Sequence, residues 1–347
     1  MEKKNLWIFI AVAYGVTALM SIIMLIAFKK GYDTTSLVNA QMMYPACGVI
    51  LGKLITKSED DDLPMAGFIT VLVTTAVMML MAILSVVAHI EPLEVAGQSL
   101  DIWNLLAQIP IVIGSIVAYI LFWTCGREKR ENAGIERKNI KLSVIMIILF
   151  IALLIGRVML GVFIEDFRLG NDQGLQGVLT AVRSPLTWIT LIVLPVNFVL
   201  AFIAFFGEEY GWRYYLQPVM QNRFGKRAGV LLLALVWAVW HIPVDFMYYS
   251  KDDGIQAFVS QIIVCVAISI FFGYAYMKTE NIWVPVIMHY LYNNISAILA
   301  GGAGNADALK DQVIEWGLLP GFAVSFVVFY LFILAPAYKK AENHENE

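Results

Sequence analysis

Two adjacent carboxylates end a long apolar run in the segment Gly207-Glu208-Glu209-Tyr210-Gly211-Trp212-Arg213. Two acids at a membrane boundary cost free energy unless they are paired or used. In a helix, Glu209 and Arg213 lie four residues apart on one face, which suits an ion pair, whereas Glu208 points about 100° away. Glu208 is therefore the carboxylate available for chemistry. The alternative is an interfacial charge cluster at the end of a span.

A histidine lies deep in the next apolar run, in Trp237-Ala238-Val239-Trp240-His241-Ile242-Pro243. This imidazole could transfer protons in a reaction. It could equally be a core histidine that bonds a backbone carbonyl freed by the kink at Pro243. Asp245, four residues after His241, could orient the imidazole ring, although the proline disturbs ideal helical geometry there.

A third polar group occurs in His289-Tyr290-Leu291-Tyr292-Asn293. His289 and Asn293 are four residues apart and therefore share one helical face. They could serve a reaction together, or they could form interhelical hydrogen bonds that hold a bundle. Asn294 faces elsewhere and is the weaker candidate.

The convergence of these groups points to amide hydrolysis. Of the four histidines, His241 and His289 accompany the Glu pair, whereas His89 lies at a span end and His344 in a polar tail. One Glu, two His and one Asn supply a general base, a second proton-handling group and donors for an oxyanion. Other protease chemistries lack their residues: GxSxG and HExxH are absent, and Asp245 has no second intramembrane aspartate as a partner.

The composition places these residues in a membrane. Hydrophobic residues make up 60% of the 347 positions and charged residues 15%, against about 45–50% and about 25% in soluble domains. The apolar residues form blocks of about 20, the length that spans a bilayer. We predict an all-α polytopic transmembrane bundle of about ten spans, with a range of eight to ten. The predicted spans are 6–28, 37–55, 65–88, 102–123, 142–163, 186–206, 228–246, 257–277, 282–300 and 316–335.

A basic loop divides the chain. We expect an N-terminal four-span accessory section (1–125), the basic loop (126–141), a connecting span with an outer loop (142–184), a catalytic core (185–300), and a last span with a polar tail (301–347). Ionisable residues inside spans concentrate in the later part, so chemistry is expected there. The net charge of −3 and the absence of nucleic-acid motifs exclude a nucleic-acid partner. Cys47, Cys125 and Cys265 show no CxxC spacing and are read as packing residues.

Basic residues set the expected orientation, because Lys and Arg near span ends stay in the cytoplasm. With the N-terminus inside, most of the 24 Lys and Arg fall in cytoplasmic segments, many of them in the 126–141 loop. Lys29 and Lys30 on the outer side are a local exception. We therefore predict a multi-pass protein surrounded by membrane lipid, with both termini cytoplasmic. In the absence of a eukaryotic targeting signal, the membrane is expected to be bacterial.

Taken together, the three motifs resemble those of the family of CAAX-processing and bacteriocin-processing intramembrane proteases. That family, which includes the Ras-converting-enzyme type of prenyl endopeptidase and bacterial immunity-type proteins, carries EExxxR, FxxxH and HxxxN on successive membrane helices. Here the motifs read Glu208-Glu209-x-x-x-Arg213, Trp237-x-x-x-His241 and His289-x-x-x-Asn293, in the same order. The resemblance covers about residues 185–300. Trp237 stands where phenylalanine is usual, and we expect this change to alter packing rather than chemistry.

The resemblance implies an intramembrane endopeptidase acting on a membrane-associated peptide or protein that approaches from the cytoplasmic side. Glu208 with His241 would activate a water, and His289 with Asn293 would stabilise the oxyanion. The remaining motif residues, Glu209 and Arg213, would hold the site.

The family has often been described as metalloproteases, so zinc is a possible cofactor. Its ligands would be Glu208, His241 and His289. We prefer a metal-free reaction, because catalytic zinc needs three firm protein ligands and these side chains serve equally well as base and oxyanion donors.

Two other classes remain open. A non-catalytic bacteriocin-immunity or scaffold protein would bind a peptide within the bundle, but the motif residues are all present. A transporter could use intramembrane His and Glu as a proton relay, yet inverted halves are not evident.

Overall fold

Helices account for nearly all of the chain in the computed structural model, which describes residues 2–58, 62–95, 98–299 and 309–339. A two-stranded antiparallel ribbon of β1 (Leu93–Val95) and β2 (Gln98–Leu100) is the exception. The predicted all-α membrane bundle is confirmed. Ala300, at the end of the predicted core, and the tail with His344 lie outside the described residues.

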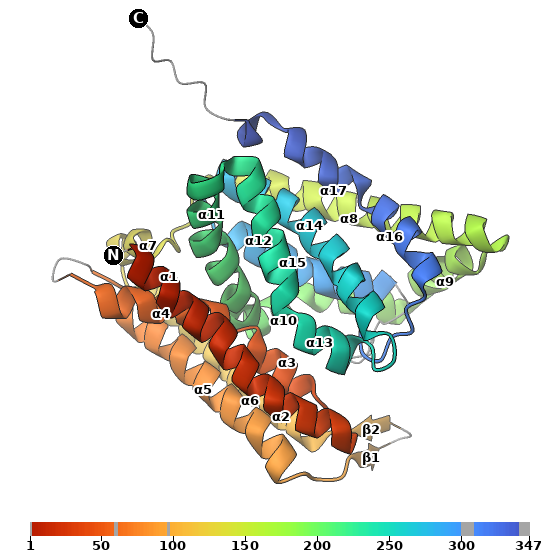
Figure 1. Ribbon diagram of the computed structural model, residues 1–347, viewed down its shortest axis with the longest axis horizontal. Helices are drawn as coiled ribbons and strands as arrows, with labels where there is room; N and C mark the ends of the chain where they lie inside the picture. The colour runs from red at the N-terminus through yellow and green to blue at the C-terminus, as the bar shows by residue number, and fades with distance from the viewer. Residues whose placement is uncertain (1, 59–61, 96–97, 300–308, 340–347) are drawn as a thin grey trace, which may run out of the picture.

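The N-terminal section forms one slanted layer, coloured red to yellow in Figure 1. A long apolar helix begins it, and two shorter helices, α3 and α4, follow before the hairpin of α5 and α6. Its helices are α1 (Glu2–Ile10), η1 (Ala11–Val16), α2 (Thr17–Lys30), α3 (Thr35–Gln41), α4 (Tyr44–Thr56), α5 (Met65–Val87) and α6 (Ile102–Thr124).

The rest of the chain forms a second group of helices that packs on this layer (Figure 1). Its first part is α7 (Arg127–Ala133), α8 (Ile140–Leu169), α9 (Gln173–Arg183), α10 (Pro185–Glu209), η2 (Tyr210–Leu216), α11 (Gln217–Phe224) and α12 (Lys226–Trp240). Its second part is α13 (Ile242–Val244), η3 (Asp245–Tyr249), α14 (Gly254–Thr279), α15 (Trp283–Ala297), η5 (Trp316–Leu318), α16 (Leu319–Ser325), α17 (Val327–Leu331), η6 (Phe332–Leu334) and η7 (Pro336–Tyr338).

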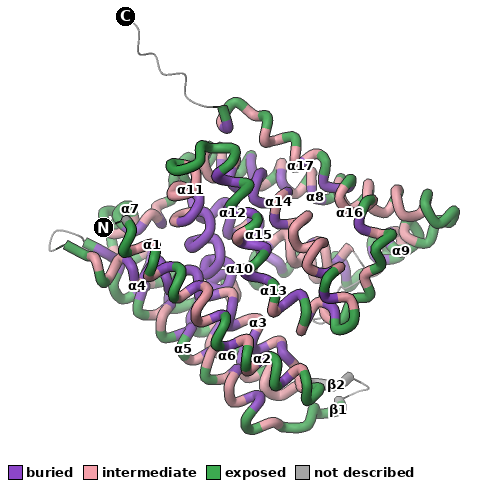
Figure 2. The backbone as a smooth tube through the Cα atoms, viewed as in Figure 1, coloured by how far each residue is buried: buried purple, intermediate pink, exposed green. Residues whose placement is uncertain are grey.

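Six helices in the described residues are long and apolar enough to cross a membrane, or up to eight if two bent pairs each form one span. Eight is the lower end of the predicted range. Two predicted windows fall short as single helices: 37–55 is divided between α3 and α4, and 282–300 holds α15 of 15 residues. Large apolar side chains such as Ile148, Phe163 and Ile192 are exposed on the outer faces, while buried residues line the interior (Figure 2). Such an apolar exterior fits a multi-pass membrane protein.

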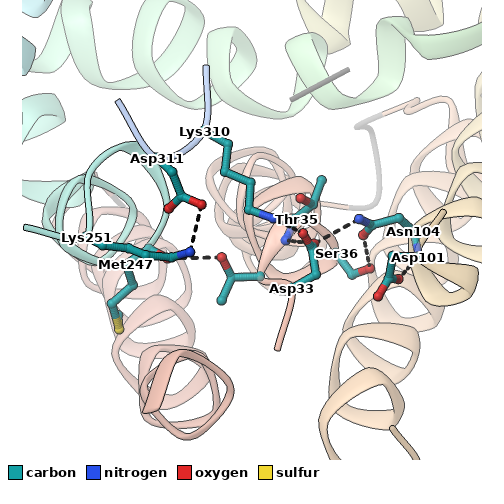
Figure 3. A network of polar contacts seen from close by, with 10 residues as sticks. Asp33, Thr35, Ser36, Asp101, Asn104, Met247, Lys251, Lys310 and Asp311 are labelled. Atoms are coloured by element: carbon teal, nitrogen blue, oxygen red, sulfur yellow. Dashed lines mark hydrogen bonds and ion pairs between the residues drawn. The ribbon is translucent and has the colours of Figure 1, made fainter. Parts of the chain in front are cut away.

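Predicted inner and outer loops gather at opposite ends of the bundle. At one end, Lys138 lies 3.4 Å from Glu280. At the other end, Asp33 contacts Asn104 and Lys310 (Figure 3). Helices that run alternately up and down place alternate loops at opposite ends of the bundle. The predicted motifs lie on helices in the middle of the molecule. There α10, α12 and α15 lie between the N-terminal layer and α8 with α16 (Figure 1).

Candidate active site

The Glu pair lies at the end of α10, where the helix passes into the π-helical turn η2. The helical path continues without a break from residue 185 to 224. A π-helical turn inside a longer helix is frequently found at functional sites. Here the change of helical pitch directly follows Glu208 and Glu209, both of which are buried.

Glu209 bridges two other motif residues. Its carboxylate lies 3.2 Å from Nε of Arg213, the predicted four-residue ion pair, and accepts a hydrogen bond from Nδ1 of His289 at 2.8 Å. The guanidinium makes no well-directed hydrogen bond with the described residues, and its carbon lies 4.4 Å from the centre of the Trp237 ring. Charge and stacking therefore hold Arg213 in place.

Glu208 points away from Glu209 and toward α12, as the separation of about 100° between adjacent helical side chains predicts. Its carboxylate accepts a hydrogen bond of 2.9 Å from the indole N–H of Trp237 on α12. The same indole ring packs edge-on against the imidazoles of His241 and His289, with centroids 5.7 and 5.6 Å away. The expectation that Trp237 matters for packing alone is therefore incomplete, because phenylalanine has no N–H to offer Glu208.

His241 lies at the break that Pro243 causes. Helix α12 ends at Trp240, and the segment after it turns by 42°. The backbone N–H of His241 donates to the carbonyl of Ala238, so the Trp237 carbonyl accepts from Nδ1 of the imidazole at 2.9 Å. A carbonyl can only accept, hence Nδ1 carries the hydrogen and Nε2 of the neutral ring is unprotonated.

Asp245 does not orient His241. Neither of its carboxylate oxygens has a hydrogen-bond partner among the described residues, although the side chain is fully buried. The backbone carbonyl of Trp237 takes the role that the sequence offered to Asp245.

On α15, the two predicted polar residues have different surroundings. His289 gives Nδ1 to Glu209, which leaves Nε2 for another partner. Asn293 follows one turn later and is half-buried, with no hydrogen bond to Glu208 or to either imidazole in the described part of the chain. Asn294 donates to the backbone carbonyl of Tyr290, which agrees with its ranking as the weaker candidate.

Exposure divides the motif residues into two sets. Glu208, His241 and His289 are 3%, 7% and 6% exposed, whereas Glu209 and Arg213 are 0% exposed. All five side chains are therefore buried, and those of Glu209 and Arg213 completely so.

Two glycines flank the Glu pair and were not recognised from the sequence. A Cβ atom at Gly207 would lie 2.7 Å from the Cα atom of Met43, and one at Gly211 would lie 3.0 Å from the backbone of Pro45. Small residues four apart let helix backbones approach closely in membranes. The GxxxG spacing around Glu208 and Glu209 was the signal that could have revealed this contact.

The N-terminal section also bonds the end of α12. Gln41 donates from Nε2 to the carbonyl of Trp240 at 3.0 Å, and the Tyr14 hydroxyl donates to the carbonyl of Val236 at 2.6 Å. The Trp240 carbonyl is one of the last four of α12, which lack a helical donor, whereas the Val236 carbonyl lies one position before them. The N-terminal section thus contacts the helix that leads to His241 as well as the helix that carries the Glu pair.

A metal site is not ready-made in this arrangement. Within the described ranges, no three His, Cys, Asp or Glu side chains come close enough together to hold a metal ion. Glu208, His241 and His289 could offer one carboxylate and two Nε2 atoms, but their present geometry does not bring them to a common centre.

Known proteins resemble this region of the chain. Residues 187–295 match the family model for type II CAAX prenyl endopeptidases, Rce1-like. The CAAX prenyl protease 2 of Methanococcus maripaludis is 25% identical over 142 residues, which cover 39% of this chain and 50% of that protein. The chain thus spans about half the length of this curated relative. No solved structure matches. All the motif residues described above fall inside the matched segment.

Proposed function

We propose that this chain, whose residues 187–295 match the family model of Rce1-like type II CAAX prenyl endopeptidases, hydrolyses a peptide bond in a membrane-associated peptide or protein. Glu208 and His241 activate the attacking water, and His289 with Asn293 binds the oxyanion. Glu209 and Arg213 hold these groups in place. This division of roles rests on the chemistry of the side chains and on their contacts.

In the proposed reaction, the Glu208 carboxylate takes a proton from water, and the resulting hydroxide attacks the substrate carbonyl carbon. The negative charge that develops on the carbonyl oxygen is stabilised by the amide N–H of Asn293 and by Nε2–H of a doubly protonated His289, whose Nδ1–H already donates to Glu209. The C–N bond then breaks as the proton is delivered to the leaving amine. His241, whose Nε2 is unprotonated in the neutral ring, shares this proton transfer with Glu208.

One observation carries the proposal. Three helices bring Glu208, His241 and His289 against the two edges and the backbone of a single residue, Trp237. Each imidazole has Nδ1 occupied by an oxygen acceptor, so each presents Nε2 to a reactant. A packing role gives no reason for two buried histidines and a buried carboxylate to gather around one indole ring.

The expected approach from the cytoplasm is supported by two clefts at the end of the bundle that holds the basic 126–141 loop. Their volumes are about 660 and 390 Å³, and both are lined by Tyr214, Pro218 and Tyr276. Pro218 lies on the helical path that carries Glu208, about three turns farther along. None of the motif residues lines either cleft, so the proposed route requires the peptide to pass from the cleft along this helix to the Glu pair.

The test is cleavage of a labelled membrane-peptide library by purified protein, with and without a zinc chelator. We expect Glu208→Ala and His241→Ala to lose cleavage by at least about 100-fold, and cleavage by the unmodified protein to survive chelation. Loss on chelation, with recovery on added zinc, would identify a metalloenzyme. No cleavage by folded protein of any peptide would favour the immunity or scaffold function.

A further inference from the structure

We propose that Trp237 is a positioning residue, whose indole N–H holds the Glu208 carboxylate in the orientation that activates water. This inference rests on the proposed function, because it assigns a role to a residue beside the same site. Trp237 itself need not touch the substrate.

The contact is short and shielded from solvent. The indole Nε1 of Trp237 lies 2.9 Å from Oε2 of Glu208, and both residues are 3% exposed. Among the described residues, this is the one hydrogen bond that Glu208 accepts. A hydrogen bond to an ionised group is stronger than a neutral one, and a buried carboxylate without a donor is costly. Trp237 therefore determines where the Glu208 oxygens lie.

Trp237 also contacts both of the proposed proton-handling groups. Its side chain donates to Glu208, while its backbone carbonyl accepts from Nδ1 of His241. Trp237 thus bonds both the Glu208 carboxylate and the His241 imidazole. Phenylalanine would keep the carbonyl contact and lose the indole contact, so the two can be separated by one substitution.

The indole ring is itself held firmly. The Arg213 guanidinium lies over its face at 4.4 Å, and His289 packs against it at 5.6 Å. A cation over an aromatic face and an edge-on aromatic neighbour both favour one ring orientation. The N–H therefore points at Glu208 as a fixed donor.

The kinetic test compares Trp237→Phe with unmodified protein. We expect kcat to fall about 10- to 100-fold with KM changed by less than about threefold, because a directed hydrogen bond to the reacting carboxylate is lost while substrate contacts stay. Trp283→Phe is the matched control: it removes the same atoms and a 2.7 Å indole bond to the Ile135 carbonyl, away from Glu208. An unchanged kcat in Trp237→Phe, or an equal loss in both variants, would overturn the proposal.

A spectroscopic test does not depend on turnover. In protein labelled with ¹⁵N-tryptophan, the indole signal missing from Trp237→Phe identifies Trp237. We expect that signal to move in Glu208→Gln, which removes the charged acceptor, and to stay in place in Glu165→Gln on α8. A signal that ignores Glu208→Gln contradicts the positioning role even if peptides are cleaved. If the signal moves in Glu208→Gln but the unmodified protein cleaves no peptide, the contact is supported and the proposed function is contradicted.

Discussion

Gly207 packs on Met43 so closely that a Cβ atom at the glycine would come within 2.7 Å of the methionine Cα atom. The contact joins the helix that carries Glu208 to the break between α3 and α4. Backbone packed on backbone leaves little freedom, so the N-terminal section sets the position of the Glu pair. This gives the first section a physical task, although its sequence has few ionisable residues.

The first prediction concerns this contact. Gly207→Ala should lower the free energy of unfolding by about 1–3 kcal/mol, because backbone atoms cannot move aside for the new methyl group. The measurement is thermal unfolding in detergent. Gly156→Ala on α8 is the control, since nothing lies within 4 Å of its added Cβ. The control should be neutral or slightly stabilising, and equal destabilisation of both variants would contradict the close contact.

Helix positions and faces were largely readable from the sequence. The predicted span 102–123 corresponds to α6 (Ile102–Thr124), because an apolar block of that length has one way to satisfy its backbone in lipid. The ion pair of Glu209 with Arg213 followed from helical periodicity, which holds over one turn even where the helix becomes π-helical.

The sequence did not show which helices those faces would contact. Periodicity tells which residues share a face, but Glu208 could have met any helix, and its partner Trp237 lies 29 positions away. Hydropathy alone did not mark the division of the 37–55 window at Met42 and Met43, although Pro45 in the first turn of α4 is a typical helix-start signal. Long-range packing decides such features, and local composition carries no record of it.

A second prediction concerns the buried ion pair. Glu209→Leu should lower the free energy of unfolding by about 3–5 kcal/mol, because it leaves the Arg213 cation buried without its counter-charge. Glu165→Leu, which breaks the partly exposed pair with Arg168, should cost under about 1 kcal/mol. Denaturation of both variants in the same detergent gives the comparison.

The double variant Glu209→Leu with Arg213→Met separates stability from activity. Replacing both charges by apolar groups should restore most of the stability. Cleavage should stay low, because His289 then lacks the acceptor that orients its ring. Full recovery of cleavage would show that Glu209 serves stability alone.

A third prediction tests the bond from the N-terminal section to α12. Gln41→Leu should cost about 1–3 kcal/mol of stability, because the buried Trp240 carbonyl loses its donor. Gln176→Leu on α9 removes an exposed side-chain bond to Asp172 and should change stability by less than about 0.5 kcal/mol. The measurement is thermal unfolding of both variants. Indistinguishable melting temperatures would contradict the role of Gln41.

The end of the bundle opposite the basic 126–141 loop carries a charge network centred on Asp33. Asp33, between α2 and α3, accepts hydrogen bonds from Lys310, from the backbone N–H of Thr35 and from Asn104 on α6 (Figure 3). Burial alone would raise the pKa of Asp33, but these donors outweigh it and hold the pKa below its ordinary value. The network therefore links both sections of the chain in a pH-dependent way.

The last prediction follows from that lowered pKa. Since the folded state favours the ionised form, Asp33 contributes stability above its unfolded pKa of about 3.9, and this contribution disappears as the pH falls through the lower folded pKa. Asp33→Asn should therefore cost about 2 kcal/mol near neutral pH. The difference in melting temperature from the unmodified protein should stay constant down to about pH 4 and shrink below it. Asp172→Asn, which makes the same substitution at an exposed site, is the matched control for the stability measurement. A gap for Asp33→Asn that is the same at every pH would mean that the carboxylate acts by shape rather than by charge.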